Sequence, residues 1–166
     1  MFKQAEFDKN GGLGIFDAKT LVYTQKGGGI QRSTDAGQNW TKVSDFQPTA
    51  RVVRILKGTA YWLAADGILV SKDQGATWAH QGTAVDATIG PMLDPKNDKH
   101  MAAAGMKGIF ETTDGGETWK QVGKLPPGFS MPKAGWFANV AWDPASGTFY
   151  ASQMGKPTYK LQMGKN

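Results

Sequence analysis

The sequence predicts an all-β fold, a β-propeller of four-stranded antiparallel blades with about four blades in the chain. Three observations lead to this prediction. One eight-residue motif occurs three times, its aspartates Asp35, Asp73 and Asp114 are 38 and 41 residues apart, and short apolar segments flank every copy. A repeat of about 40 residues is typical of one propeller blade. No segment shows a sustained helical period, so no helix is expected.

The repeated motif reads S/T-x-D-x-G-x-x-W and can be understood as a turn. An aspartate in a tight turn accepts hydrogen bonds from backbone N–H groups one or two residues ahead, glycine permits a positive φ, and the hydroxyl can tie the other side. The tryptophan begins the next strand and can bury its ring between sheets. The motif is therefore predicted to fasten a hairpin without a ligand. Its fixed positions are Ser33, Asp35, Gly37, Trp40, Ser71, Asp73, Gly75, Trp78, Thr112, Asp114, Gly116 and Trp119.

A second recurring feature is a pair of apolar segments separated by an aspartate-centred turn, found at Asp17, Asp94 and Asp143. Together with the strands on each side of the motif, this pair gives four strands per unit, named a to d in chain order. The whole chain, residues 1–166, is expected to form a single propeller domain. The expected blades are residues 8–45, 46–83, 84–123, and 124–166 completed by 1–7.

Composition limits the classes of function. The 166-residue chain has a net charge of +5 and no cysteine. Disulfides, thiolate zinc sites and cysteine nucleophiles are therefore excluded. Sixteen of the 19 basic residues are lysines spread along the chain, whereas nucleic-acid sites cluster cations and favour arginine, so no nucleic-acid partner is expected. We also expect no membrane span, because no run of 18 apolar residues occurs, and the N-terminus shows no signal-peptide pattern.

The motif resembles the Asp-box, or BNR, repeat of sialidases, xyloglucan-active glycosidases, sortilin-type receptors and photosystem assembly factors. The three copies match this repeat well, and the related strand pattern covers nearly the whole chain. The resemblance implies a sialidase-like propeller whose boxes lie on the face opposite the ligand site. It also implies an extracellular or periplasmic location, but no particular activity; the sequence itself leaves the compartment open.

The last blade is incomplete at the C-terminal end of the sequence. No fourth motif follows Asp143, while Phe2-Lys3-Gln4-Ala5 resembles Trp119-Lys120-Gln121-Val122, which begins a d strand. We therefore expect residues 2–7 to pair with residues 157–163, because joining first and last strands removes open sheet edges. Three arrangements remain open: a four-bladed monomer, an eight-bladed ring of two chains, or part of a longer propeller.

The sequence contains few residues that could form a catalytic site. The sialidase resemblance would require three converging arginines, but the chain has only Arg32, Arg51 and Arg54, of which the last two are expected to point to opposite faces of one strand. Glycoside hydrolysis requires two carboxyls about 5–10 Å apart. The candidates are Asp45 and Asp86, both in d-to-a connections. Neither the two histidines nor the glycine-rich turns suggest a metal or cofactor, so none is expected.

Binding residues are expected on the rim formed by the b–c turns and the d–a connections. An apolar centre with cationic edges there suits a protein or a sugar stacked on an aromatic ring. The leading prediction is a noncatalytic scaffold or recognition module that binds a protein or a glycan. The alternative is a glycosidase or a fragment of one. The candidate ligand contacts are Phe46, Arg51, Met106, Lys107, Phe129, Met131, Trp136, Met154 and Lys156, of which the aromatic residues could instead fill the core beneath the loops.

Overall fold

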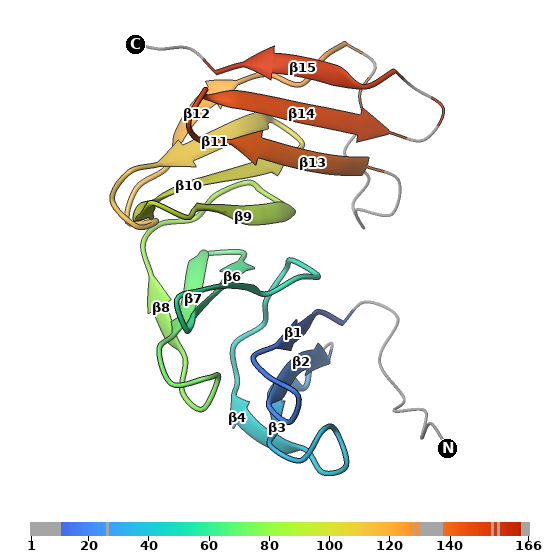
Figure 1. Cartoon of the computed structure of the whole chain (residues 1–166), viewed down its shortest axis with the longest axis vertical. Coiled ribbons are helices and arrows are strands. Elements are labelled where there is room, and N and C mark those ends of the chain that lie inside the picture. The colour runs from blue at the N-terminus through green and yellow to red at the C-terminus, as the bar shows by residue number, and fades with distance from the viewer. Residues whose placement is uncertain are drawn as a thin grey trace. The chain divides into compact units, whose positions relative to one another are not determined.

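The computed structural model describes residues 11–25, 27–127, 129, 138–153, 155 and 157–163. These residues form fifteen β-strands and no helix (Figure 1). The predicted all-β class is therefore confirmed. The chain divides into two compact units, Met1–Gln81 and Gly82–Asn166.

The first unit contains two four-stranded antiparallel sheets, with strand orders β1-β2-β3-β4 and β5-β6-β7-β8. Each strand pairs with the next one along the chain, as a propeller blade requires. The first sheet consists of β1 (Leu13–Ile15), β2 (Leu21–Gln25), β3 (Gly29–Ser33) and β4 (Thr41–Ser44). The second consists of β5 (Arg54–Leu56), β6 (Thr59–Ala64), β7 (Gly67–Ser71) and β8 (Ala79–Gln81).

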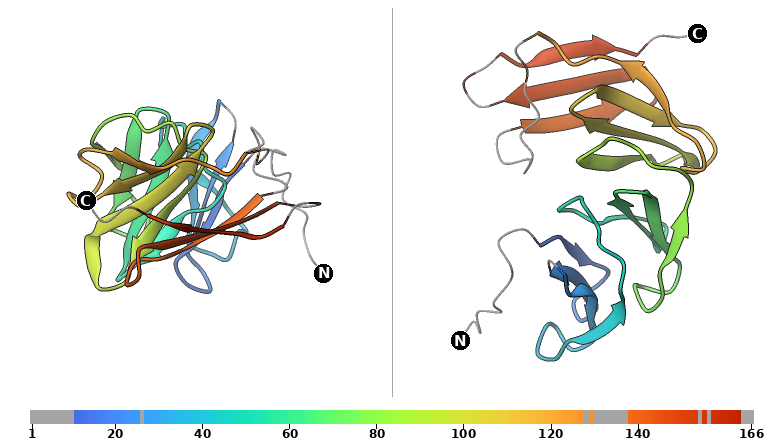
Figure 2. Two further views of the ribbon diagram at one scale, coloured as in Figure 1. Left: turned by 90° about the horizontal axis from the view of Figure 1, so that it is seen from above. Right: turned by 180° about the vertical axis from the view of Figure 1, so that it is seen from behind.

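The second unit repeats this plan, with one four-stranded sheet and one described three-stranded sheet, β13-β14-β15 (Figures 1 and 2). The first of these is formed by β9 (Ile89–Asp94), β10 (Asn97–Gly105), β11 (Gly108–Thr112) and β12 (Lys120–Gly123). The other is formed by β13 (Ala138–Asp143), β14 (Thr148–Gln153) and β15 (Tyr159–Gln162). Its expected fourth strand, residues 2–7, lies outside the described residues, so that pairing stays a prediction.

Segments of the inner strands β6, β7 and β10 are buried on both faces. Ala60 to Ala64 of β6 and all of β7 are buried, as are Met101 to Gly105 of β10. These segments are nearly continuous apolar runs instead of alternating patterns, because neither of their faces meets water. In the second unit, side chains from both sheets form one core. Its buried members are Met92, Ala102, Ala104, Ile109, Phe129, Phe149, Ala151 and Met163.

Each S/T-x-D-x-G-x-x-W motif forms the c–d turn of its sheet with one hydrogen-bond pattern. In the second copy, the Ser71 hydroxyl donates to Asp73 Oδ1 (2.9 Å) and accepts from the Gly75 N–H (2.8 Å). Thr77 donates its N–H to Asp73 Oδ1 (2.9 Å) and its hydroxyl to Oδ2 (2.6 Å). The carboxylate thus reaches four residues ahead, not one or two as expected, because an eight-residue turn brings the start of the outgoing strand back to it.

The other two copies repeat this geometry. Asn39 and Thr118 each donate a backbone N–H and a side-chain group to Asp35 and Asp114 respectively, with distances of 2.6–3.0 Å. The hydrogen bonds from Asn39 are the main cause that lowers the pKa of Asp35 to about 2. The hydroxyls of Thr112 and Thr118 likewise hold the pKa of Asp114 well below its usual range. All three motif carboxylates are therefore charged at neutral pH.

The second motif also packs on the first sheet within the first unit. Gly75 has a φ of 81°, and a Cβ at this position would lie 2.5 Å from Val22 Cγ1. A side chain would therefore be both strained and blocked, which explains the glycine. Arg32 Nε donates to the carbonyl of Gln74 (2.9 Å) from β3 of the first sheet. The turn thus joins two sheets that are adjacent in sequence.

The geometry predicts a purely structural cost for removing a motif aspartate. Asp73→Ala leaves the buried Ser71 hydroxyl without its acceptor and frees the Thr77 donors, so we expect the free energy of unfolding to fall by about 1–3 kcal/mol. Urea unfolding followed by circular dichroism measures this change. Asp98→Ala is the control, because Asp98 is exposed in β10 and holds no turn. Equal stability of the two variants would contradict the fastening role.

Candidate functional site

The predicted rim residues fall into three groups. Met131, Trp136, Met154 and Lys156 lie outside the described residues and stay predictions. Phe129 is only 9% exposed and packs edge-on against Tyr159 (ring centroids 6.0 Å apart). This burial favours the core role over ligand contact. The half-buried Phe46 and Arg51 lie in the connection between β4 and β5, and Met106 and Lys107 lie in the β10–β11 turn.

The β10–β11 turn presents an exposed methionine beside an ion pair. The Met106 side chain is 62% exposed. Lys107 Nζ lies 3.4 Å from Asp86 Oδ2, and the Lys107 carbonyl accepts a hydrogen bond from Gln121 Nε2 (2.7 Å). A Cβ on Gly105 would lie 1.7 Å from the Asp86 carbonyl oxygen, so the β8–β9 connection packs directly on this turn. The β10–β11 turn is therefore held by Gln121 of β12 and by Asp86 of the β8–β9 connection.

The two candidate glycosidase carboxylates each bind a lysine. Asp45 forms an ion pair with Lys42 and its side chain is 92% exposed, while Asp86 is paired with Lys107. Asp45 belongs to the first unit and Asp86 to the second. An opposed acid and base require two carboxyls enclosed around one substrate bond. Their role in catalysis stays a prediction, and the described residues leave the Asp45 side chain exposed.

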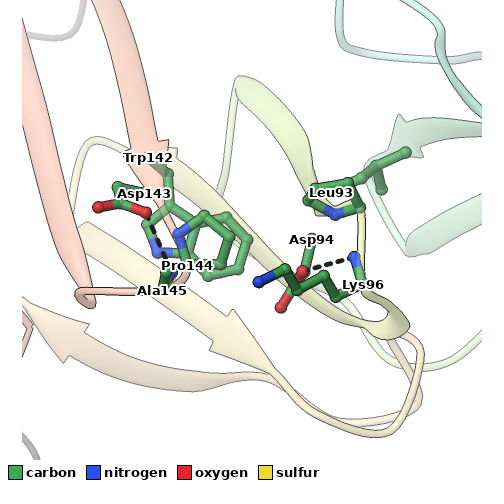
Figure 3. A pocket seen from close by; sticks show the side chains of 8 residues that line it. Leu93, Asp94, Lys96, Trp142, Asp143, Pro144 and Ala145 are labelled. Atoms are coloured by element: carbon green, nitrogen blue, oxygen red, sulfur yellow. Dashed lines mark hydrogen bonds between the residues drawn. The ribbon is translucent and has the colours of Figure 1, made fainter.

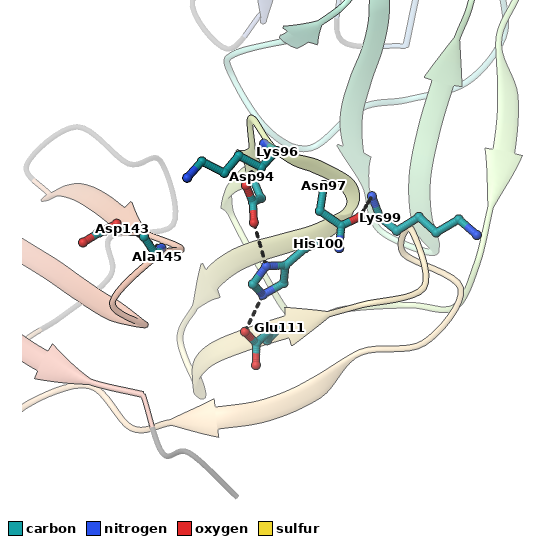
Figure 4. A network of polar contacts seen from close by, with 8 residues as sticks. All are labelled: Asp94, Lys96, Asn97, Lys99, His100, Glu111, Asp143 and Ala145. Atoms are coloured by element: carbon teal, nitrogen blue, oxygen red, sulfur yellow. Dashed lines mark hydrogen bonds and ion pairs between the residues drawn. The ribbon is translucent and has the colours of Figure 1, made fainter.

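A third cluster, missed by sequence reasoning, surrounds His100 (Figure 4). β10 places the imidazole between two carboxylates: Nδ1 lies 3.0 Å from Asp94 Oδ2 and Nε2 lies 2.7 Å from Glu111 Oε1. The ring meets Trp142 of β13 edge-to-face, with centroids 4.8 Å apart. His100 therefore joins β9, β10 and β11 to the neighbouring sheet of the second unit.

The His100 cluster favours a positively charged ring. Burial lowers the pKa of His100, but the hydrogen bonds and charges of Glu111 and Asp94 outweigh it, so the pKa lies above its usual value. Both ring nitrogens must carry a proton to donate to both carboxylates. Neither nitrogen then remains to accept a proton from a nucleophile or to bind a metal. The described residues contain no group of three or more acidic, histidine or cysteine side chains arranged for a metal ion.

Beside this cluster lies a hollow of about 450 Å³ between two aspartate–proline turns (Figure 3). One turn joins β9 to β10 and the other joins β13 to β14. The Asp94 carboxylate accepts the Lys96 N–H (2.8 Å), and the Asp143 carboxylate accepts the Ala145 N–H (3.0 Å). The hollow is lined by Leu93, Asp94, Pro95, Lys96, Trp142, Asp143, Pro144 and Ala145.

Part of this site could be predicted from the sequence. The Asp94 and Asp143 turns were predicted, but their proximity depends on the packing of two sheets. His100 meets Glu111 through hairpin register: Ala102 lies opposite Glu111, so His100, two residues earlier on the same face, is its diagonal neighbour. The tight turn between Gly105 and Gly108 is the sequence feature from which this register could have been counted.

Comparison with known proteins identifies the family. The sequence model of the DUF6242 beta propeller domain matches residues 13–135. The chain belongs to this family. The propeller fold predicted from the repeat is thereby confirmed. The described part of this family member has no helix of the length and apolarity that a membrane crossing requires.

One curated relative is the dispase autolysis-inducing protein of Streptomyces mobaraensis, which is 30% identical over 124 residues. The match covers 72% of this chain and 33% of the relative, so the chain spans about a third of that protein's length.

Two solved propellers are similar in fold to this DUF6242 chain. A GH74 xyloglucanase from Xanthomonas campestris has a TM-score of 0.56 at 16% identity, covering 89% of this chain and 28% of the enzyme. YCF48 from Cyanidioschyzon merolae has a TM-score of 0.53 at 15% identity, covering 93% of this chain and 56% of YCF48. At these identities the likeness concerns the fold alone.

The His100 cluster predicts a pH-dependent stability. Because the pKa of His100 is raised in the folded protein, its stabilising contribution is complete below the unfolded-state pKa of about 6.5 and is lost as the pH rises through the folded value. We expect wild type to be more stable than His100→Gln at pH 6, with the difference narrowing as the pH rises. Urea unfolding between pH 5.5 and 9 measures it.

The Glu111→Gln variant provides the matched test of the cause. Removing this carboxylate charge should lower the pKa of His100, as read from its ring resonances by NMR. A stability difference that is constant over this pH range, together with an unchanged His100 pKa in the variant, would contradict the charged cluster.

Proposed function

We propose that this chain is a noncatalytic β-propeller module that binds a protein partner through the β10–β11 turn and the β8–β9 connection beside it. The observation that carries the proposal is the exposed Met106 next to the Lys107–Asp86 ion pair. Methionine on a surface adapts to an apolar partner surface, and flanking charges set orientation.

The described rim residues favour a protein over a glycan. A sugar would need an aromatic face, but Phe129 is buried in the core and Phe46 is half-buried. The hydrogen bond from Gln121 to Lys107 and the packing of Asp86 on Gly105 hold the turn in place before binding. A preorganised turn loses little conformational entropy when a partner docks.

The curated relative suggests a first partner to test. Its name describes an effect on another protein, the induction of autolysis of dispase. The matched region covers a third of that relative, so it is a proposal that this part of the fold makes the contact. We therefore take dispase as the probe for protein binding by this chain.

Substitution of the turn should weaken dispase binding without unfolding the chain. We expect Met106→Asp to raise the Kd at least about tenfold, because a charge would replace a central apolar contact. Lys107→Glu should also weaken binding, with a smaller effect at high salt. Biolayer interferometry measures both. Ile15→Asp is the control, since Ile15 is 60% exposed but lies in β1 of the first unit.

Two results would contradict this proposal. One is unchanged dispase affinity in folded Met106→Asp and Lys107→Glu variants. The other is hydrolysis of a β-glucan or sialoside panel by the wild type that is lost in the Asp45→Asn, Asp86→Asn double variant, which would favour the glycosidase alternative. The double variant keeps side-chain size while removing both charges, so loss of activity would report on chemistry.

A further inference from the structure

We propose that the hollow between the β9–β10 and β13–β14 turns is a binding site for a small carboxylate carried on a six-membered ring. This site is separate from the Met106 turn and does not depend on its role. Two sources share the chemistry, an acidic sugar and an aromatic acid, and the experiment below distinguishes them.

The shape of the hollow suits one ring. Its volume of about 450 Å³ lies within the range of small-ligand sites, which are mostly apolar with a few polar groups. The two turns occupy equivalent positions in successive sheets of the second unit, and each contributes a proline to the walls. Trp142 adds an indole on which a flat or alicyclic ring can stack.

The lining offers one cationic contact for a ligand, the Lys96 ammonium, beside the carboxylates of Asp94 and Asp143. Figure 3 shows the Lys96 side chain extending toward Trp142 and Pro144. No described acidic side chain forms an ion pair with the Lys96 ammonium. The Lys96 side chain is exposed, so its ammonium is accessible to a ligand. A ligand carboxylate beside the indole would meet this ammonium while its ring covers the apolar wall.

The carboxylates of the lining do not oppose this arrangement strongly. Asp94 is hydrogen-bonded to the His100 ring and accepts the Lys96 N–H. Asp143 accepts from the Ser146 hydroxyl and the Ala145 N–H, and Figure 3 shows its carboxylate pointing away from the opposite turn. Both carboxylates are thus engaged by hydrogen bonds from their own turns and, at Asp94, from His100.

The indole is held in position before any ligand arrives. His100 contacts it edge-to-face from β10, and the imidazole itself is fixed by Asp94 and Glu111. A fixed aromatic wall and turns braced by aspartates reduce the entropy lost on binding. For a ligand of about a dozen heavy atoms, this supports a Kd of about 1 mM.

The test follows the six tryptophan indole N–H signals of the 15N-labelled chain by NMR at pH 7 and low salt. Trp142→Phe identifies the Trp142 signal. Glucuronate and benzoate are titrated to about 20 mM, well above the expected Kd. Glucose and benzyl alcohol are their neutral counterparts. The expected result is a saturable shift of the Trp142 signal with at least one of the acids and a weaker response to its neutral counterpart.

Substitution of Lys96 tests whether its ammonium recognises the carboxylate of the ligand. Lys96→Gln should weaken acid binding by about two- to fivefold, the range for an exposed ion pair, while Lys96→Arg retains it. Lys120→Gln, an exposed lysine of β12 outside the lining, is the matched control and should bind as wild type does. Saturation by glucuronate alone assigns an acidic sugar, and saturation by benzoate alone assigns an aromatic acid. Both acids binding supports the shared chemistry.

Three results would overturn the proposal. These are no saturable Trp142 shift with either acid, equal responses to the acids and their neutral counterparts, or unchanged acid affinity in Lys96→Gln. Unfolding curves of Lys96→Gln should match wild type, because the ammonium has no described ion pair to lose. Met106→Asp should leave the Trp142 response unchanged, so failure here is distinguishable from failure of the protein-binding proposal.

Discussion

The carboxylate of each motif aspartate is the constraint on which the sheets depend. In every copy it joins the residue two positions before it to the residue four positions after it, at the point where the c strand ends and the d strand begins. Two consecutive residues in each turn have positive φ, for example Gln74 and Gly75. Such a backbone is costly for a residue other than glycine, and the hydrogen bonds to the carboxylate offset that cost.

These turns also explain why the fold repeats. A d strand that begins at a fixed place gives the three sheets that carry a motif the same strand order and the same arrangement of turns. In the first unit the second motif additionally packs Gly75 against Val22 and receives Arg32 on the Gln74 carbonyl, so one turn closes its own hairpin and contacts the preceding sheet. The repeated sequence motif therefore specifies a repeated set of turn contacts in addition to repeated strand-forming segments.

The carboxylate contacts of each motif lie within one hairpin, and such local contacts are the part of the structure that the sequence could predict. The motif spacing gave the strands and their order, because each hairpin is determined within about ten residues. The donors Asn39, Thr77 and Thr118 were missed, although all three stand four residues after their aspartate, because a turn aspartate was expected to bind nearer neighbours. Phe129 could not be assigned to core or rim from sequence, since its burial depends on Tyr159, thirty residues further on.

The sites were less predictable than the fold for the same physical reason. The β10–β11 turn could be named as a rim element because its place follows from strand alternation. The hollow at Lys96 and Trp142 requires two sheets to bring separate turns together, and His100 requires the register of β10 with β11. Non-local packing and register are the properties that a single sequence specifies least directly.

The placement of the two candidate sites follows from the direction of one strand. β10 begins at Asn97 beside the hollow and ends at Gly105 beside Met106, so its nine residues separate the sites by roughly 25 Å. Antiparallel order puts the a–b and c–d turns at one end of each sheet and the b–c turn at the other. A ligand at Lys96 and a protein at Met106 would therefore contact opposite ends of the same buried strand. Met101 to Ala104, which lie between the two sites, are fully buried, so the side chains that separate the sites contact neither ligand.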